Sequence, residues 1–413
     1  MKTTINKPPE LMAPAGDWTM LRAAVKAGAD AVYFGVDKLN MRAKAKNFSV
    51  EELPEITKFC RAKPASPAGG KVKTYLTLNT IVFEDELEEA DKIISAAKKA
   101  KIDRIICSDL AVAELCNKHK IQFCISTQSS ISNSLAASVY KKLGAVRIVL
   151  ARECSLEEIK KIRKNTDLEI EAFIHGAMCI AVSGRCFMSH HLFGQSANRG
   201  ECVQPCRREY EVFDPATNNS LFIGDDYILS PKDLCTIEFI DQLIEAGIDS
   251  FKIEGRKRAP EYVAKTVSVY RNAIGLYYQK KLTSEKKKEF LKELETVYNR
   301  GFSTGFYFGK PSSDDYAGVD GTKATTRKVY VGKVLNYFKK PKAAHILLES
   351  GKVNLNDRLL IIGETTGLVE LTLDDLIIND KSSRSAKKGD EVTFVTTELV
   401  RRNDKVYLIE QLN

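Results

Sequence analysis

The sequence predicts an α/β fold: a TIM-like (β/α) barrel with a cysteine-rich insertion, followed by a small C-terminal β-barrel. From residue 10 onward, short apolar runs alternate with amphipathic stretches, which is the pattern of alternating strands and helices. The runs are nearly all apolar, as expected for parallel strands covered on both faces. Eight of them favour a closed barrel over an open doubly wound sheet. The expected strands are residues 11–13, 31–35, 74–78, 104–108, 122–126, 147–151, 169–174 and 250–253.

Helix-capping residues support this assignment. Asp17 stands directly before the amphipathic stretch 18–27, where its carboxylate can accept from the first free backbone N–H groups. Ser155 is followed three positions later by Glu158, which is the spacing of a capping box. No G-x-G-x-x-G follows the first expected strand, so the sequence gives little support to a dinucleotide-binding fold.

The strand–helix alternation is interrupted once. About sixty residues separate the expected strand that ends near His175 from a helix expected at about Thr236. Long insertions after barrel strands lie at the C-terminal face, where active sites of such barrels are built. We therefore expect residues 1–310 to form the barrel domain and its insertion, about 177–230, to carry the function.

The C-terminal part has a different pattern. A long helical region is expected from residue 259 to about 299, followed by a turn-rich break at 300–305. Short alternating strands are then expected at 329–334, 344–348, 357–362, 391–395 and 405–410. We expect residues 328–413 to form a separate small β-barrel, which either binds nucleic acid or caps the main domain.

Composition limits the class of protein. The chain has 413 residues, of which 44% are hydrophobic, so it can bury a large core and is not a disordered or fibrous protein. No apolar run is long enough to span a membrane and the first residues do not resemble a signal peptide, so we expect a cytoplasmic protein. The net charge of +9 favours an anionic partner, although a solvated basic surface explains it equally well.

Nine of the ten cysteines fall into two groups, with Cys235 apart from both, and a reducing compartment argues against disulfides. Five stand alone in hydrophobic stretches and are expected in the core: Cys60, Cys107, Cys116, Cys124 and Cys154. Four others lie within one glycine-rich segment: Cys179, Cys186, Cys202 and Cys206.

The four clustered thiols predict a metal centre, because thiolates are soft metal ligands. Only Cys202 and Cys206 have the short spacing usual in structural zinc sites, so a 4Fe-4S cluster is favoured over zinc or over four unligated cysteines. Cys235 is an alternative fourth ligand. We prefer Cys206 because Cys235 is expected to begin a helix.

Motifs in this segment and elsewhere in the chain resemble those of a known family. The motifs are H-G-A-M-C at 175–179, S-G-R-C-F-M-S at 183–189, C-V-Q-P-C-R at 202–207, S-P-K-D-L at 230–234 and D-S-F-K-I-E-G-R at 249–256. L-M-A-P-A-G at 11–16, D-A-V-Y-F-G at 30–35 and N-R-G-F at 299–302 match as well. These motifs resemble the collagenase-like peptidase family U32 over about residues 1–310.

The resemblance implies more than one activity. Some members of the family were named collagenases or proteases, others are hydroxylation proteins of tRNA or ribosomal RNA, and relatives in ubiquinone synthesis hydroxylate without molecular oxygen. This chain is most similar to the tRNA group, which forms 5-hydroxyuridine at the wobble position with prephenate as co-substrate. The resemblance places the cluster on Cys179, Cys186, Cys202 and Cys206. It also implies three candidate partners: tRNA, a small anionic co-substrate and a second member of the family.

A protease is the first alternative, and an oxygen-independent hydroxylase of a small aromatic substrate is the second. A protease needs an activated nucleophile or a metal-bound water, and the chain has neither H-E-x-x-H nor G-x-S-x-G. Catalysis by Cys179 with His175 is conceivable, but it would leave the three other clustered cysteines unexplained. A cluster accounts for all four.

Polar residues that end the expected strands share the catalytic face of a barrel. They are Asn79, Gln128, Arg152, Glu153, His175 and Glu254. Of these we expect His175, Glu254 and Arg152 to be catalytic. Arg185, Arg207 and Arg256 are expected to bind the carboxylates of a co-substrate, although a structural ion pair is an alternative for each. Tyr33 and Tyr75 could stack on a base, but packing in the core is the preferred interpretation.

Overall fold

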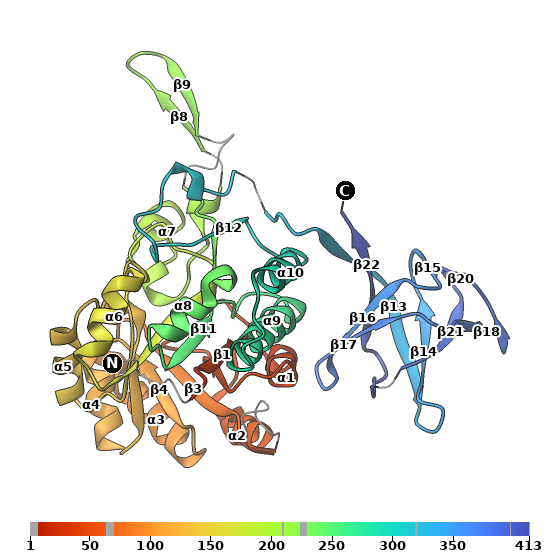
Figure 1. Cartoon of the computed structure of the whole chain (residues 1–413), viewed down its shortest axis with the longest axis horizontal. Coiled ribbons are helices and arrows are strands. Elements are labelled where there is room, and N and C mark those ends of the chain that lie inside the picture. Colours follow the sequence, from red (N-terminus) through yellow and green to blue (C-terminus); the bar gives the residue numbers. More distant parts are fainter. Residues whose placement is uncertain are drawn as a thin grey trace.

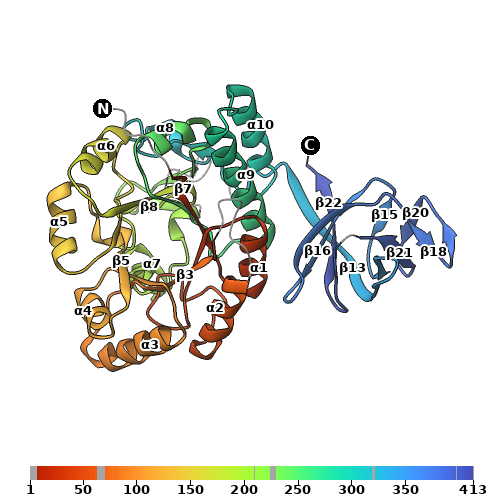
Figure 2. The ribbon, with the colours of Figure 1, turned by 60° about the horizontal axis from the view of Figure 1, so that its bottom comes forward.

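The computed structural model describes residues 7–62, 70–208, 210–223, 229–318, 321–396 and 398–412. The N-terminal part is a closed ring of eight parallel strands in which β11 pairs with both β1 and β7. The predicted TIM-like barrel is therefore confirmed, and Figure 2 shows its helices around the ring. The strands are β1 (Glu10–Pro14), β2 (Ala31–Phe34), β3 (Lys73–Leu78), β4 (Arg104–Cys107), β5 (Gln122–Ile125), β6 (Arg147–Val149), β7 (Glu169–Gly176) and β11 (Ser250–Ile253).

Helices follow the strands and cover the outside of the ring. They are α1 (Trp18–Lys26), α2 (Leu53–Ala62), α3 (Leu87–Lys99), α4 (Leu110–Lys118), α5 (Ser134–Lys142), α6 (Leu156–Lys164), α8 (Ile240–Glu245) and α9 (Pro260–Tyr278). Both predicted caps are present: the Asp17 carboxylate accepts from the backbone N–H of Met20, and Ser155 forms a capping box with Glu158. The predicted long helical region 259–299 is two helices, α9 and α10 (Ser284–Glu295), because the chain turns at Lys280, whose φ is +56°.

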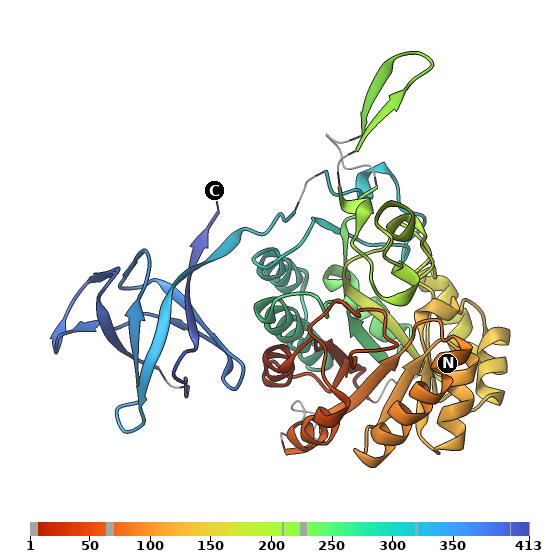
Figure 3. The same ribbon diagram turned by 180° about the vertical axis from the view of Figure 1, so that it is seen from behind.

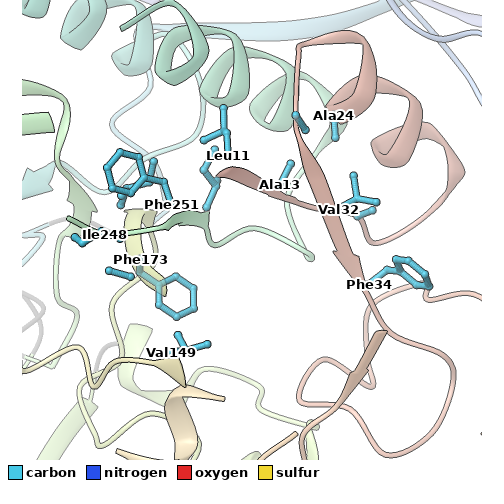
Figure 4. Close-up of a cluster of buried hydrophobic side chains, with 14 of the residues drawn as sticks. Leu11, Ala13, Ala24, Val32, Phe34, Val149, Phe173, Ile248 and Phe251 are labelled. Carbon is cyan, nitrogen blue, oxygen red and sulfur yellow. The ribbon is translucent and has the colours of Figure 1, made fainter. Parts of the chain in front are cut away.

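Alternate side chains of the strands face two different layers. Leu11, Ala13 and Val32 belong to the large apolar layer between strands and helices, part of which Figure 4 shows. Met12 and Tyr33 point to the other side, into the interior of the ring. The five cysteines predicted for the core are all buried and free, which confirms that prediction.

The insertion after β7 contains helix α7 (Met188–Phe193) and the hairpin of β8 (Tyr210–Asp214) and β9 (Asn219–Ile223). In Figure 3 this hairpin projects away from the barrel. The expected helix start at Cys235 was wrong. Cys235 ends strand β10 (Asp233–Cys235), which pairs antiparallel with the end of β7, and α8 begins only at Ile240. β12 (Phe302–Ser303) pairs with β10.

The C-terminal part forms an antiparallel sheet of eight strands with an apolar core of its own. All five predicted strands are present. The elements are β13 (Thr326–Phe338), β14 (Ala343–Leu348), β15 (Lys352–Asn354), β16 (Arg358–Gly363), β17 (Gly367–Thr372), β18 (Ile377–Ile378), β19 (Lys381–Ser382), β20 (Ser385–Lys387), β21 (Glu391–Val395) and β22 (Lys405–Gln411), with β15 and β20 paired separately. This sheet lies beside α1 and α9 (Figure 1), where Leu360 and Leu368 pack against Ala23.

Candidate active site

A cavity of about 150 Å³ lies at the C-terminal ends of the barrel strands. Asn79, Gln128, Arg152 and Glu254, which follow β3, β5, β6 and β11, line it from the barrel side. The insertion lines it from the other side with residues such as Met188 of α7. The predicted convergence of polar strand-end residues is thus observed for these four positions.

A buried network of charges fills the barrel beneath the cavity. Arg147 pairs with Glu10 at 2.7 Å and with Glu171 at 3.0 Å, and Glu171 also accepts from Lys252 at 2.8 Å. Burial alone would raise the pKa of Glu10, but the cationic neighbours Arg147 and Lys73 hold it below its usual value. Each of these charges therefore has an opposite partner, and the network forms a fixed polar floor.

Glu254 is the carboxylate of the cavity. Arg42 donates from Nη2 and Nε to its Oε1, at 2.9 and 3.2 Å, and the Tyr33 hydroxyl lies 3.4 Å from its Oε2. Burial would raise the pKa of Glu254, but the guanidinium groups of Arg42, Arg152 and Arg256 outweigh burial and lower it to about 2. The side chain is an anion at neutral pH, and its low pKa makes it a weak general base.

Positive charge exceeds negative charge in this cavity. Arg152 stacks over the Phe173 ring at 3.9 Å and donates to the carbonyl of Ala177, while its buried Nε has no hydrogen-bond partner among the described residues. Arg256 donates to Thr77 at 3.0 Å, and burial lowers its pKa to about 10, so it stays cationic at neutral pH. Together with Arg42, these guanidinium groups surround one carboxylate, an arrangement that favours an anionic ligand.

All four clustered cysteines line the same cavity. They are free thiols, with Cys179 exposed and Cys186, Cys202 and Cys206 half-buried. Within the described ranges, no three His, Cys, Asp or Glu side chains are close enough together to hold a single metal ion. The thiols therefore surround the cavity without meeting at one point.

Polar contacts hold the backbone beside each thiol. Asn198 accepts from the backbone N–H of Cys186 at 2.8 Å, and the N–H of Gln204 donates to the sulfur of Cys202 at 3.4 Å. Arg207 donates to the carbonyl oxygens of Met178 and Pro231, the first of which directly precedes Cys179. Its guanidinium is thus engaged with the protein itself, and the prediction that it binds a co-substrate carboxylate has no support in these contacts.

Five predicted residues lie outside the cavity lining: exposed Glu153, Tyr75 in the buried interior of the barrel, His175, Arg185 and Cys235. His175 is fully buried among Tyr262, Tyr270 and Phe302, and burial lowers its pKa to about 3. Its side chain faces α9, which carries Tyr262 and Tyr270, because the β7–β11 pairing shifts register just before His175. Arg185 is exposed and donates to the carbonyl of Gln128 at 3.1 Å. Cys235 is buried beside the Tyr270 hydroxyl.

Sequence reasoning missed Arg42 and Lys257, both of which line the cavity. Lys257 directly follows Arg256 in the motif region and could have been included with it. Arg42 lies in the loop after β2, outside the motif at 30–35, and no sequence signal distinguished it. Gly200 of the insertion lets this loop pack closely against it. A Cβ at Gly200 would lie 2.2 Å from the carbonyl oxygen of Asn40, and the φ of Gly200 is +88°.

In the part of the chain that the structure describes, no helix is long and apolar enough to cross a membrane. This fits the absence of a long apolar run in the sequence.

Comparison with known proteins identifies relatives over nearly the whole chain. An uncharacterized protease of Methanocaldococcus jannaschii is 42% identical over 97% of this chain and 98% of its own length. A collagenase of Porphyromonas gingivalis is 39% identical over 97% of this chain and 98% of its own. A tRNA hydroxylation protein of Bacillus subtilis is 40% identical over 81% of this chain and 79% of its own. The model of peptidase family U32 matches residues 16–316, and the chain belongs to this family.

Proposed function

We propose that this protein is an iron–sulfur-dependent tRNA hydroxylation protein that forms 5-hydroxyuridine with prephenate as co-substrate. The observation that carries the proposal is the joint presence of four free thiols and an excess of guanidinium groups in one cavity at the catalytic face of a barrel. The relative from Bacillus subtilis, named a tRNA hydroxylation protein, supports the substrate class.

The thiols suit a 4Fe-4S cluster as ligands. A single zinc ion needs four ligand atoms within about 2.3 Å of one point. A cluster spreads its irons, so each thiolate binds a different iron and the sulfurs stand further apart. Cys179, Cys186, Cys202 and Cys206 all line one cavity, so one cluster there would take all four as ligands. Such a cluster would supply electron transfer.

The guanidinium groups suit the co-substrate. Prephenate carries two carboxylates, and Arg152 and Arg256 both face the cavity with cationic side chains. Glu254 holds Arg42 in place and balances part of this charge. In this arrangement Arg152, with its unpartnered Nε, would bind and orient a carboxylate of the co-substrate.

A peptidase is the second candidate, because the similar protein from Porphyromonas gingivalis is named a collagenase. A cysteine peptidase would pair Cys179 with a histidine. His175 instead lies behind the strand, buried next to Tyr270, and burial keeps it neutral. The arrangement of His175 therefore favours the hydroxylation protein.

The two functions leave different products. Protein purified without oxygen should be assayed in parallel for hydroxylated uridine in tRNA supplied with prephenate, and for cleavage of gelatin. We expect hydroxylated uridine that is lost in Cys179→Ser, and no cleavage of gelatin. Gelatin cleavage that depends on Cys179, without any hydroxylated nucleoside, would favour the peptidase.

A further inference from the structure

Aromatic side chains beside the cavity are unusually exposed. Phe187, directly before α7, is 75% exposed, and Phe193 at the end of α7 is 40% exposed. Among large apolar side chains of the described residues, only Leu135 is more exposed than Phe187. Burial of an exposed phenylalanine would release free energy, so two exposed rings on one short segment beside the cavity lining form a candidate binding surface.

Both exposed rings belong to the segment that carries the lining residues Cys186 and Met188. Phe187 stands in the chain between Cys186 and Met188, and both of these residues line the cavity. Phe193 lies on the same short helix as Met188. A molecule that reaches the thiols is therefore expected to pass close to these two rings.

Cationic groups accompany the rings. The guanidinium of Arg208 lies 4.4 Å from the centre of the Phe193 ring, and Arg208 directly follows Arg207, which lines the cavity. The exposed side chain of Lys257 belongs to the cavity lining as well. Residues 187–193 contain two histidines and no carboxylate. Aromatic faces interleaved with cations match the bases and phosphates of a single-stranded nucleic acid.

A second pair of the same kind lies on another loop. Arg199 stands 4.7 Å from the centre of the Phe83 ring, and Phe83 is also exposed. Arg199 directly precedes Gly200 of the cavity lining, and it pairs with Glu86. Because that ion pair neutralises Arg199, the pair of Phe193 and Arg208 is the better site for a phosphate.

We propose that Phe187 and Phe193 form a stacking platform for the unpaired nucleotides next to the target base, with Arg208 binding their phosphate. The inference rests on the proposed function and adds its recognition residues. It predicts that the protein distinguishes an RNA loop from a fully paired RNA, because only unpaired bases expose a face for stacking.

The test measures binding of full-length protein, purified without oxygen, to two RNA probes. One is a hairpin whose loop contains unpaired uridines, and the other is a fully paired duplex of the same length. Each aromatic ring lost should lower affinity for the hairpin by about tenfold, which is the scale of base stacking. Phe187→Ala and Phe193→Ala should therefore weaken hairpin binding, alone and more so together, and leave duplex binding unchanged.

Matched variants separate stacking from other roles. Phe187→Trp keeps an aromatic face and should retain affinity, whereas Phe187→Leu keeps only apolar area and should not. Leu143→Ala is the surface control, because Leu143 is exposed at the C-cap of α5, the end of the helix that lies away from the strand C-termini. Thermal unfolding and iron content of every variant should match those of the wild type.

The outcomes are distinguishable. Hairpin affinity that survives in the double variant, or is restored equally by Phe187→Leu, overturns the platform. Loss of self-association in Phe187→Ala without loss of RNA affinity also overturns it, and identifies the rings as a contact between copies. If the wild type hydroxylates tRNA and the double variant does so with unchanged KM, the platform fails while the proposed function stands. If the wild type neither binds the hairpin nor modifies tRNA, both fail.

Discussion

Arg207 donates a hydrogen bond to the carbonyl oxygen of Met178 and so joins two separate parts of the cysteine-rich insertion. Arg207 directly follows Cys206, and Met178 directly precedes Cys179. The same guanidinium also donates to Ser230 at 2.9 Å. One side chain thus fixes the relative positions of two thiols that are 27 residues apart in the chain.

Replacing Arg207 should therefore reduce metal retention more than it reduces folding. Arg207→Met removes all of these hydrogen bonds and leaves buried carbonyl oxygens without partners, at a cost of about 1–3 kcal/mol. We expect a lower iron and sulfide content per chain in protein prepared without oxygen. Arg185→Met is the matched control, because exposed Arg185 lies outside the cavity lining. Equal iron content in the two variants would contradict this role for Arg207.

The choice of fourth ligand can be tested with serine variants. Cys206 lines the cavity with the other three thiols, whereas Cys235 is buried beside Tyr270, and burial raises its pKa to about 12. Cys206→Ser should empty the iron–sulfur site, and Cys235→Ser should leave the iron content nearly intact. Iron and sulfide assays together with the visible spectrum measure this. Loss of iron only in Cys235→Ser would show that Cys235 is the ligand.

Glu254 should make stability depend on acid pH. Its pKa is about 2 in the folded protein and lies near its ordinary value of 4.5 in the unfolded chain. The unfolded state therefore binds the proton first, and the stabilisation, present above pH 4.5, is lost as the pH falls towards 2. In Glu254→Gln this contribution, at most roughly 3 kcal/mol, should be missing. Denaturant unfolding of the wild type and of Glu254→Gln at several pH values measures this contribution. Parallel pH profiles of the two free energies of unfolding would contradict the prediction.

His175 should affect stability in a different pH range. Burial lowers its folded-state pKa to about 3 from an ordinary value of 6.5, so below pH 6.5 the unfolded chain gains a proton that the folded protein cannot bind. Stability should fall as the pH drops below 6.5, by up to about 1.4 kcal/mol per pH unit from this group. His175→Leu cannot titrate and should show a shallower loss between pH 6.5 and 5. An unchanged slope would mean that His175 is protonated in the folded protein.

The sequence was sufficient for the barrel because strand burial has a local signature. The eight strands are short, mostly apolar runs, and caps such as Asp17 and Ser155 mark helix starts through contacts within a few residues. Cys235 was misplaced because its strand depends on pairing with His175, which is sixty residues away. Pairing at that distance leaves no pattern in either segment alone.

Prediction of the candidate site from the sequence was limited in the same way. Glu254 and Arg152 were predicted because their position after a strand fixes them at the catalytic face, and both line the cavity. His175 also ends a strand, but its side chain faces outward, because a register shift between β7 and β11 after Phe173 breaks the alternation of inward and outward side chains. Arg42 reaches Glu254 from a loop whose path depends on packing against the insertion, so its sequence context gave no indication of its role.

The function proposed for this protein is hydroxylation of uridine in tRNA. The most direct measurement is nucleoside mass spectrometry of bulk tRNA from cells in which the gene is deleted, and from the same cells complemented with the wild type or with Cys179→Ser. We predict that nucleosides derived from 5-hydroxyuridine disappear on deletion, return with the wild type and stay absent with Cys179→Ser. A nucleoside profile that does not change on deletion would contradict the claim.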